Sequence, residues 1–446
     1  MHVDPTIFKA YDIRGIYPEQ LDEETGRAVG RAFASFLLPE RVVVGRDMRL
    51  SSPSVSAALI EGLRQQRADV LDLGMVSTDQ YYYACATLGL PGVMVTASHN
   101  PAQYCGFKMV RDMPYLLSGD EGIQDLRRLI EAEDFRSARG TGTIEPRDVS
   151  DGFVDKVLDM VDATRLRRLK VVADTGNGMV GPSLTRVYDR LPVDLVGMYL
   201  DPDGSLPNHG LDPMKPENRA ELEARVVSEG ADVGFAFDGD GDRFFAIDDR
   251  GQFVPGDFLT ALMAQYLIER EPGATIIYDV RCSWAVRDLV EAAGGVALQE
   301  RVGHSFLKPR LLSEEGVFAG ELSGHYYFRD FFGADSGLVP SLILLQMMSE
   351  RGQTMSQLLS PLESRYFLSG EINSRVDDPS AKIEAIAARY GDGQIERVDG
   401  ISVSFADWHF NVRASNTEPL LRLNLEGRTR QRMEHQRDEV LAVIRT

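Results

Sequence analysis

The sequence predicts an α/β fold: three successive α/β domains followed by a smaller α+β domain. Three observations support this expectation. The chain has 446 residues, enough for two to four domains. Strand-like and helix-like segments alternate over most of its length, whereas strand-like segments dominate from about residue 366. We place the domain boundaries near residues 150, 250 and 365.

The first α/β units lie in the N-terminal third. Residues 41–49 read as a buried strand that leaves into a polar loop. A helix is expected over 51–66, because Pro53 lies near its start and apolar residues recur at helical spacing. Residues 68–76 and 91–95 are the next two strands. Such alternation favours a largely parallel sheet, in which ligands bind beyond the carboxyl ends of the strands.

Similar units follow along the chain. Residues 170–181 predict a strand, a glycine-rich turn and a helix, and residues 231–249 predict two strands joined by a carboxylate-rich loop. Residues 274–295 predict a strand and a helix, and residues 316–330 predict two strands around a polar loop. The last part differs, because strand-like segments predominate in it and only two helical stretches lie between and after them. The strand-like segments are 366–376, 401–416 and 419–427.

The composition is that of a soluble globular protein, with 43% apolar and 26% charged residues. The formal net charge of −20 argues against nucleic acid as the main partner, but a local cluster of arginine and lysine can still bind an anionic substrate. No secretory signal is visible, and the apolar run at 337–348 is shorter than the ~20 residues of a membrane span. Three sparse cysteines fit a reducing cytoplasm.

The acidic loop DGDGDR, residues 238–243, carries the sharpest chemical signal. Asp238, Asp240 and Asp242 alternate, so an extended loop turns all three carboxylates the same way. Three adjacent carboxylates repel unless a cation lies among them, and hard oxygen ligands suit Mg²⁺ or Ca²⁺. A solvated acidic turn is disfavoured by the apolar flanks. A calcium EF-hand is excluded, because its sixth and twelfth positions hold Arg243 and Asp249.

Two further motifs have a functional and a plain structural interpretation. Gly176, Gly178 and Gly181 have the spacing of a dinucleotide fingerprint, which would indicate a dehydrogenase; we favour a tight strand-to-helix turn. Ser98 beside His99 is either a nucleophile with its base or part of a polar turn at a strand end.

Several polar clusters are weaker candidates on local grounds. The segment RASNTEP concentrates donors suited to an anion, although a polar turn is equally consistent with it. The segment GELSGH sets an acceptor, a hydroxyl and an imidazole on alternate positions, a pattern that can bind sugar hydroxyls. The remaining candidates are a histidine–lysine pair and three cations near predicted strand ends: His304, Lys308, Arg14, Lys108 and Arg281.

Together these motifs resemble the α-D-phosphohexomutase family. The segments KAYDIRG, TASHNP, DGDGDR, GELSGH and RASNTEP follow one another in the family's order along nearly the whole chain. The segments FKAYDIRG and GELSGHYYFRDFFGADSG resemble the phosphomannomutase/phosphoglucomutase branch more closely than the phosphoglucosamine mutases.

The resemblance implies a central cleft, mixed rather than parallel sheets, and one motif from each of four domains. These would be a phosphoserine domain, a metal-binding domain, a sugar-recognition domain and a phosphate-binding lid: 1–150, 151–250, 251–365 and 366–446. It also implies a cytoplasmic isomerase, a phosphomannomutase that interconverts mannose 6-phosphate and mannose 1-phosphate through a phosphoserine and a hexose 1,6-bisphosphate. Glucose phosphates would be further substrates, and the product would feed GDP-mannose biosynthesis.

The implied cofactors are one Mg²⁺ per chain and glucose 1,6-bisphosphate, or an equivalent, as activator. The partner is a hexose phosphate, without nucleic acid or membrane, and the chain would be a monomer or homodimer. Phosphoglucomutase or phosphoglucosamine mutase activity is the nearest alternative. An NAD-linked dehydrogenase and a non-catalytic sugar-phosphate binding protein are more distant ones.

The resemblance also assigns roles to residues. Ser98 would carry the phosphoryl group, rather than act as a hydrolase nucleophile, since the chain has no GxSxG elbow. The catalytic residues would be Ser98, Lys108, His304, Arg14, His99 and Arg243. The metal ligands would be Ser98, Asp238, Asp240 and Asp242. The substrate-binding residues would be Tyr11, Arg281, Lys308, Glu321, Ser323, His325, Arg413, Ser415, Asn416 and Thr417.

Overall fold

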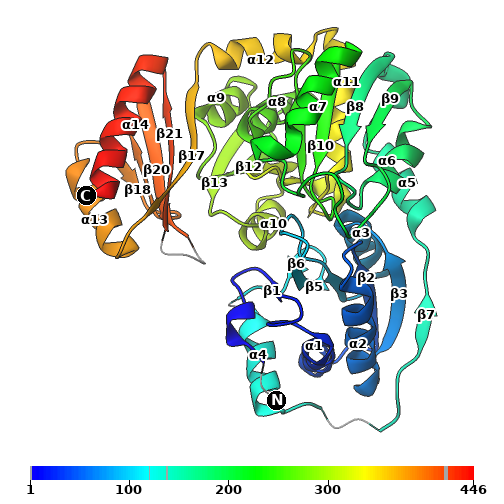
Figure 1. The fold of residues 1–446 in the computed structure, drawn as a ribbon. Helices are drawn as coiled ribbons and strands as arrows, with labels where there is room; N and C mark the ends of the chain where they lie inside the picture. Colours follow the sequence, from blue (N-terminus) through cyan, green and yellow to red (C-terminus); the bar gives the residue numbers. More distant parts are fainter. Residues whose placement is uncertain (1–2, 120, 137–138, 416–419) are drawn as a thin grey trace. The chain divides into compact units, whose positions relative to one another are not determined.

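The computed structural model describes residues 3–119, 121–136, 139–415 and 420–446 (Figure 1). The chain divides into two compact units. Unit 1 contains Met1–Val254 and Ser323–Met355, and unit 2 contains Pro255–Leu322 and Ser356–Thr446. The described part has α/β sheets in succession and ends in an antiparallel sheet, which confirms the predicted fold class.

The first sheet of unit 1 is mixed. Its strands are β1 (Ile13–Ile16), β2 (Arg41–Arg46), β3 (Asp69–Met75), β4 (Gly92–Val95), β5 (Tyr104–Asp112), β6 (Tyr115–Leu116) and β7 (Ile144–Pro146). The order is β1-β5-β4-β2-β3-β7, with β6 beside β5. From β4 to β7 neighbouring strands are parallel, but β5 is antiparallel to both β4 and β1. The largely parallel sheet expected from alternation alone was therefore wrong at this edge, because β5 returns after β4 without a crossover helix.

Two helices of this sheet pack backbone to backbone. The helical elements are η1 (Pro5–Ile7), α1 (Glu23–Leu37), α2 (Ser52–Gln65), α3 (Thr78–Leu88) and α4 (Ile123–Ala132). Helix α2 begins where Pro53 predicted it. A Cβ added at Gly62 would lie 2.1 Å from the carbonyl oxygen of Arg27, and one at Gly30 would lie 2.3 Å from that of Leu59. The contact between α1 and α2 therefore depends on glycine.

The second sheet of unit 1 presents the acidic loop. Its strands and helices are β8 (Leu169–Asp174), β9 (Val193–Met198), β10 (Val233–Phe237), β11 (Phe244–Ile247), α5 (Ser150–Leu158), η2 (Ala163–Arg165), α6 (Gly181–Tyr188) and α7 (Pro216–Glu229). The order is β11-β10-β8-β9, in which only the β10–β11 pair is antiparallel. Both strands of that pair are fully buried, so the loop between them starts and ends in the core.

The rest of unit 1 consists of β15 (Tyr326–Phe328), η3 (Arg329–Phe331), β16 (Ala334–Asp335) and α11 (Leu338–Arg351). Strands β15 and β16 pair antiparallel. The apolar run at 337–348 forms most of α11, which is buried on all sides over that run. In the described part of the chain, no helix has both the length and the apolar character needed to cross a membrane.

Unit 2 combines a parallel and an antiparallel sheet. The first comprises β12 (Thr275–Asp279), β13 (Val296–Glu300) and β14 (Phe318–Gly320), with α8 (Gly256–Ile268), α9 (Trp284–Ala292), α10 (His304–Ser313) and α12 (Met355–Glu363). The second comprises β17 (Phe367–Arg375), β18 (Gln394–Glu396), β19 (Ile401–Ser404), β20 (Trp408–Ala414) and β21 (Leu420–Gly427), with α13 (Pro379–Arg389) and α14 (Arg430–Arg445). Its order is β17-β21-β20-β19-β18, and α13 and α14 pack on it (Figure 1).

We expect Gly62→Ala to lower the free energy of unfolding by about 1–3 kcal/mol, because the new methyl group pushes α1 away from α2. Urea denaturation followed by circular dichroism measures the loss. Gly391→Ala is the matched control, since its nearest atoms would be at 3.5 Å, an ordinary contact distance. Equal stability of the two variants would contradict the packing argument.

Candidate active site

The acidic loop brings three carboxylates together in the interior of unit 1. Asp238, Asp240 and Asp242 are at most 1% exposed, and one oxygen from each lies within 4.8 Å of the others. The loop holds its shape because Asp238 Oδ1 accepts the backbone N–H groups of Gly241 at 3.2 Å and Arg243 at 3.1 Å. Charges this close in the interior repel strongly, so the site requires compensating positive charge.

Ser98 lies after β4, at the start of residues 98–104, which we call the serine loop, and it faces the acidic loop. Its Oγ donates a 2.8 Å hydrogen bond to Asp238 Oδ2. The residue is buried and has a φ of 51°, a region that few residues other than glycine adopt. A Cβ added at Gly239 would lie 2.7 Å from the Ser98 carbonyl oxygen. Glycine at this position therefore lets the serine loop and the acidic loop approach each other directly.

His99 does not act as the base of Ser98 in this geometry. Its Nδ1 lies 3.2 Å from Ser98 Oγ, but the single hydroxyl proton already goes to Asp238 at 2.8 Å. Burial and the charges of Arg243 and Arg14 lower the pKa of His99, so the ring is neutral. In the tautomer that carries its proton on Nδ1, the neutral His99 ring can donate to Ser98 Oγ.

Lys108, on β5, supplies positive charge to the three carboxylates. Its Nζ lies 2.7 Å from Asp240 Oδ2 and also pairs with Asp242. Burial lowers the pKa of Lys108, but the aspartates outweigh it and raise the pKa above its usual value. Thr78 Oγ1 donates to the same Asp240 oxygen at 2.6 Å. Lys108 is therefore protonated. Asp240 Oδ2 already accepts from both Lys108 and Thr78.

The remaining oxygens of the triad fit a divalent cation. Within the described ranges, the buried Asp240 Oδ1 has no hydrogen-bond partner. Burial and the two neighbouring carboxylates raise the pKa of Asp238. Burial acts the same way on Asp242, but Lys108 and His325 lower its pKa below the usual range. Convergent, incompletely satisfied carboxylate oxygens are the donor set that hard divalent cations prefer.

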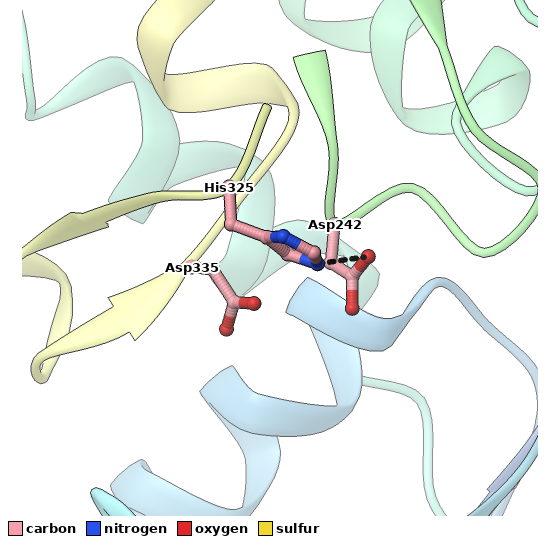
Figure 2. Close-up of side chains that lie close together, drawn as sticks. All are labelled: Asp242, His325 and Asp335. Atoms are coloured by element: carbon pink, nitrogen blue, oxygen red, sulfur yellow. Dashed lines mark ion pairs between the residues drawn. The ribbon is translucent and has the colours of Figure 1, made fainter. Parts of the chain in front are cut away.

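A second group of potential ligands shares Asp242. Figure 2 shows His325 beside Asp242, with Asp335 of β16 close to both. His325 Nε2 lies 3.6 Å from Asp242 Oδ1 and 3.3 Å from Arg243 Nε, which donates to it. His325 Nε2 already contacts both Arg243 and Asp242, whereas among the described residues Asp240 Oδ1 has no hydrogen-bond partner, so the triad Asp238–Asp240–Asp242 is the better cation site.

Cationic and polar groups surround Ser98. Arg14 of β1 pairs with Asp12 and donates to Asn100 Oδ1 in the serine loop. Arg243 and Arg14 are close enough to His99 to lower its pKa. Such a set, next to a hydroxyl and a cation site, suits a phosphate group.

Unit 2 gathers other predicted residues around Glu371. Arg281 follows β12, pairs with Asp279 at 2.7 Å and lies 3.5 Å from Glu321. Arg281 and Arg413, the latter on β20, each lie 3.7 Å from Glu371 Oε2. The cluster contains guanidinium groups that can bind an anion, and the carboxylates beside them balance their charge.

The other predicted residues are placed as follows. Tyr11 is half-buried just before β1, and Ser323 Oγ lies 3.1 Å from His325 Nδ1. His304 begins α10, Lys308 is buried within it, and Ser415 directly follows β20. Asn416 and Thr417 lie outside the described residues. The predicted residues thus fall into two groups, one in each unit.

Sequence reasoning missed Asp47, Arg49 and Thr78. Arg49 is almost fully buried and donates to backbone carbonyls of the serine loop. The available signal was an Asp-x-Arg pair directly after a buried strand. The contacts of this pair depend on β2 and β4 being neighbours in the sheet, and the local sequence does not specify that pairing.

The glycine loop after β8 packs against the acidic loop. A Cβ added at Gly178 would lie 2.7 Å from the carbonyl oxygen of Gly239. This close approach accounts for the glycine without a dinucleotide, in agreement with the tight-turn interpretation.

Four family models match the chain in succession. Phosphoglucomutase/phosphomannomutase alpha/beta/alpha domains I, II and III match residues 5–137, 151–251 and 255–366. The phosphoglucomutase/phosphomannomutase C-terminal domain matches residues 371–443.

Individual relatives match over almost the full length. The chain is 41% identical over 433 residues to a phosphomannomutase of Escherichia coli strain K12, with 95% of each chain covered. It is 40% identical over 424 residues to a protein of Xanthomonas campestris named phosphohexose mutases, covering 94% of this chain and 95% of the relative. A crystal structure of a phosphoglucomutase/phosphomannomutase family protein from Burkholderia thailandensis superposes with a TM-score of 0.92 at 36% identity, covering 99% and 98% of the two chains.

We expect Lys108→Met to bind Mg²⁺ about 10-fold more tightly than the parent chain, because the ammonium competes with a cation for Asp240 and Asp242. Affinity should also weaken as the pH falls, since the raised pKa of Asp238 lets protons compete. Titration calorimetry at several pH values measures both effects. Lys215→Met, at an exposed lysine, is the control. Weaker binding by Lys108→Met would contradict the competition.

Proposed function

The chain belongs to the phosphoglucomutase/phosphomannomutase family, and we propose that it is an isomerase that interconverts mannose 6-phosphate and mannose 1-phosphate. The observation that carries the proposal is the 2.8 Å hydrogen bond between Ser98 Oγ and Asp238 of the buried triad. It joins a hydroxyl that can carry a phosphoryl group to a site suited to a cation. The phosphomannomutase name of the E. coli relative supports the choice of sugar.

Ser98 is the phosphoryl carrier in this proposal. A hydroxyl oxygen of the hexose monophosphate attacks the phosphorus of phosphoserine 98, and the bond to Oγ breaks. The product is a hexose 1,6-bisphosphate, which turns round in the site. Ser98 Oγ then attacks the phosphorus of the other phosphate, the bond from that phosphorus to the sugar oxygen breaks, and Ser98 is phosphorylated again. The net result is that the phosphate moves between O6 and O1 of the hexose.

The charges around Ser98 suit this transfer. Asp238, Asp240, Asp242 and an oxygen of the phosphoserine would hold one Mg²⁺, which when bound neutralises charge on the transferred group. Arg243 and Arg14 add positive charge near Ser98. Lys108 is a candidate for proton transfer, but its raised pKa holds the proton on the ammonium, so in its present contacts it gives electrostatic support. His304 is the further candidate for proton transfer.

A second set of residues supplies the proposed grip on the substrate. Arg413 and Ser415, with Asn416 and Thr417, would bind the phosphate that is not being transferred. Glu321 and Ser323 would bind the 3- and 4-hydroxyls, which both orientations of the sugar present. A site that ignores C2 discriminates weakly between mannose and glucose, so glucose phosphates are proposed as further substrates. Arg281, Lys308, His325 and Tyr11 would complete the site.

We keep the four-domain division at residues 150, 250 and 365 as part of the proposal, with residues 366–446 closing as a lid. Full activity in a chain truncated before residue 366 would contradict the lid. Activation by glucose 1,6-bisphosphate, a monomeric or homodimeric state and a cytoplasmic location remain predictions.

Ser98→Ala should abolish turnover of mannose 1-phosphate and glucose 1-phosphate, because no group is left to carry phosphate. A coupled assay with Mg²⁺ and a trace of glucose 1,6-bisphosphate measures both rates. Ser228→Ala, at an exposed serine of α7, is the control and should keep the parental rates.

The parent chain's behaviour in the same assay separates the alternatives. The ratio of the two rates names the preferred sugar. Tight binding of sugar phosphate without turnover would indicate a binding protein, and binding of a nicotinamide nucleotide would favour the dehydrogenase. Either result would overturn the mutase proposal.

Arg413→Gln should raise the KM about 10- to 100-fold while changing kcat less than about 3-fold, since it removes binding that substrate and transition state share. Steady-state kinetics with mannose 1-phosphate measure the split. Arg397→Gln, which loses only an exposed ion pair with Glu384, is the control. A fall in kcat alone would contradict a gripping role for Arg413.

A further inference from the structure

A buried arginine at the end of β2 gathers the backbone of the serine loop. Arg49 is 1% exposed. Its Nη2 donates to the carbonyl oxygens of Ser98 at 2.7 Å and Asn100 at 2.6 Å. Its Nη1 donates to those of Pro101 at 2.7 Å and Tyr104 at 3.1 Å. Four carbonyl groups of one short loop therefore converge on one guanidinium plane.

Asp47 fixes the arginine itself. Asp47 Oδ2 accepts from Arg49 Nε at 3.1 Å, and Oδ1 accepts the Arg49 backbone N–H at 3.1 Å and the Ser52 hydroxyl at 2.5 Å. All five side-chain N–H groups of Arg49 are thereby engaged, four by the loop and one by Asp47. The buried charge is balanced at the same time, because Asp47 is also 1% exposed.

The serine loop needs such a support. Ser98 has a φ of 51°, which persists only where the surroundings enforce it. The carbonyl oxygen that Arg49 holds belongs to Ser98 itself, and the same atom lies against Gly239 of the acidic loop. By holding the Ser98 carbonyl group, Arg49 therefore fixes the backbone that directs Ser98 Oγ toward Asp238.

We propose that Arg49 is a positioning residue for phosphoryl transfer: it holds the Ser98–Tyr104 loop so that Ser98 Oγ stays aligned with the acidic loop. The inference rests on the proposed function. The hydrogen bonds of the Arg49 side chain within the described residues go to Asp47 and to backbone carbonyl groups of the serine loop, and none of them goes to Ser98 Oγ. Loss of Arg49 therefore changes the geometry of transfer and leaves substrate binding intact.

The test is Arg49→Lys, which keeps the charge but offers three donors in place of the planar set of five. The expected kcat for mannose 1-phosphate falls about 10- to 100-fold, while KM stays within about 2-fold. Hydrogen exchange of the amides in residues 98–104 is expected to quicken, and this readout needs no activity. Asp47→Asn, which keeps Arg49 but weakens its anchor, is expected to give the same pattern more mildly.

Leu59→Ala is the control for general destabilisation, since Leu59 lies in the core of the first sheet. It should lower the thermal midpoint and keep kcat. Parental kcat and exchange in both Arg49→Lys and Asp47→Asn would overturn the proposal, and so would an equal loss of kcat in Leu59→Ala. A parent chain without mutase activity would reject the proposed function, and the exchange rates would then still decide the role of Arg49.

Discussion

Repulsion among three buried carboxylates is the constraint on which the site in unit 1 depends. At about 4 Å, two like charges repel by about 4 kcal/mol even at an effective dielectric constant of 20. One carboxylate oxygen from each of Asp238, Asp240 and Asp242 lies within 4.8 Å of the others, so the repulsion between them is of this order. The loop is therefore stable only where other elements bring positive charge to it. Lys108 comes from β5 and Arg243 from the end of the loop itself.

This requirement ties the two sheets of unit 1 together. Lys108 belongs to the first sheet, whereas the aspartates belong to the second, so the ion pairs form only when the sheets are correctly docked. Glycines at the contact remove the side chains that would keep the loops apart, at Gly239 against Ser98 and at Gly178 against Gly239. The electrostatic demand and the close backbone packing therefore act at the same place.

The parts that the sequence predicted are those with a local signature. The acidic loop was recognisable because its spacing and apolar flanks are consecutive in the chain, and α2 because Pro53 and helical spacing mark it. The proximity of Ser98 to Asp238 has no local signature, and only the family resemblance implied it, by assigning both residues to one metal site. The antiparallel β5 and the contacts of Arg49 with the serine loop were missed, because both depend on which strands become neighbours in the sheet.

The proposed reaction explains why the two units would carry different kinds of groups. A mutase performs the same transfer twice, once at each end of the sugar, so a single rigid set of transfer groups can serve both steps. Ser98, the triad and Arg49 would form such a set within unit 1, since their contacts are short and buried. The binding groups must instead accept the substrate in two orientations. Arg281 and Arg413 suit this proposed role, because their contacts with Glu371 are 3.7 Å ion pairs that a phosphate could replace.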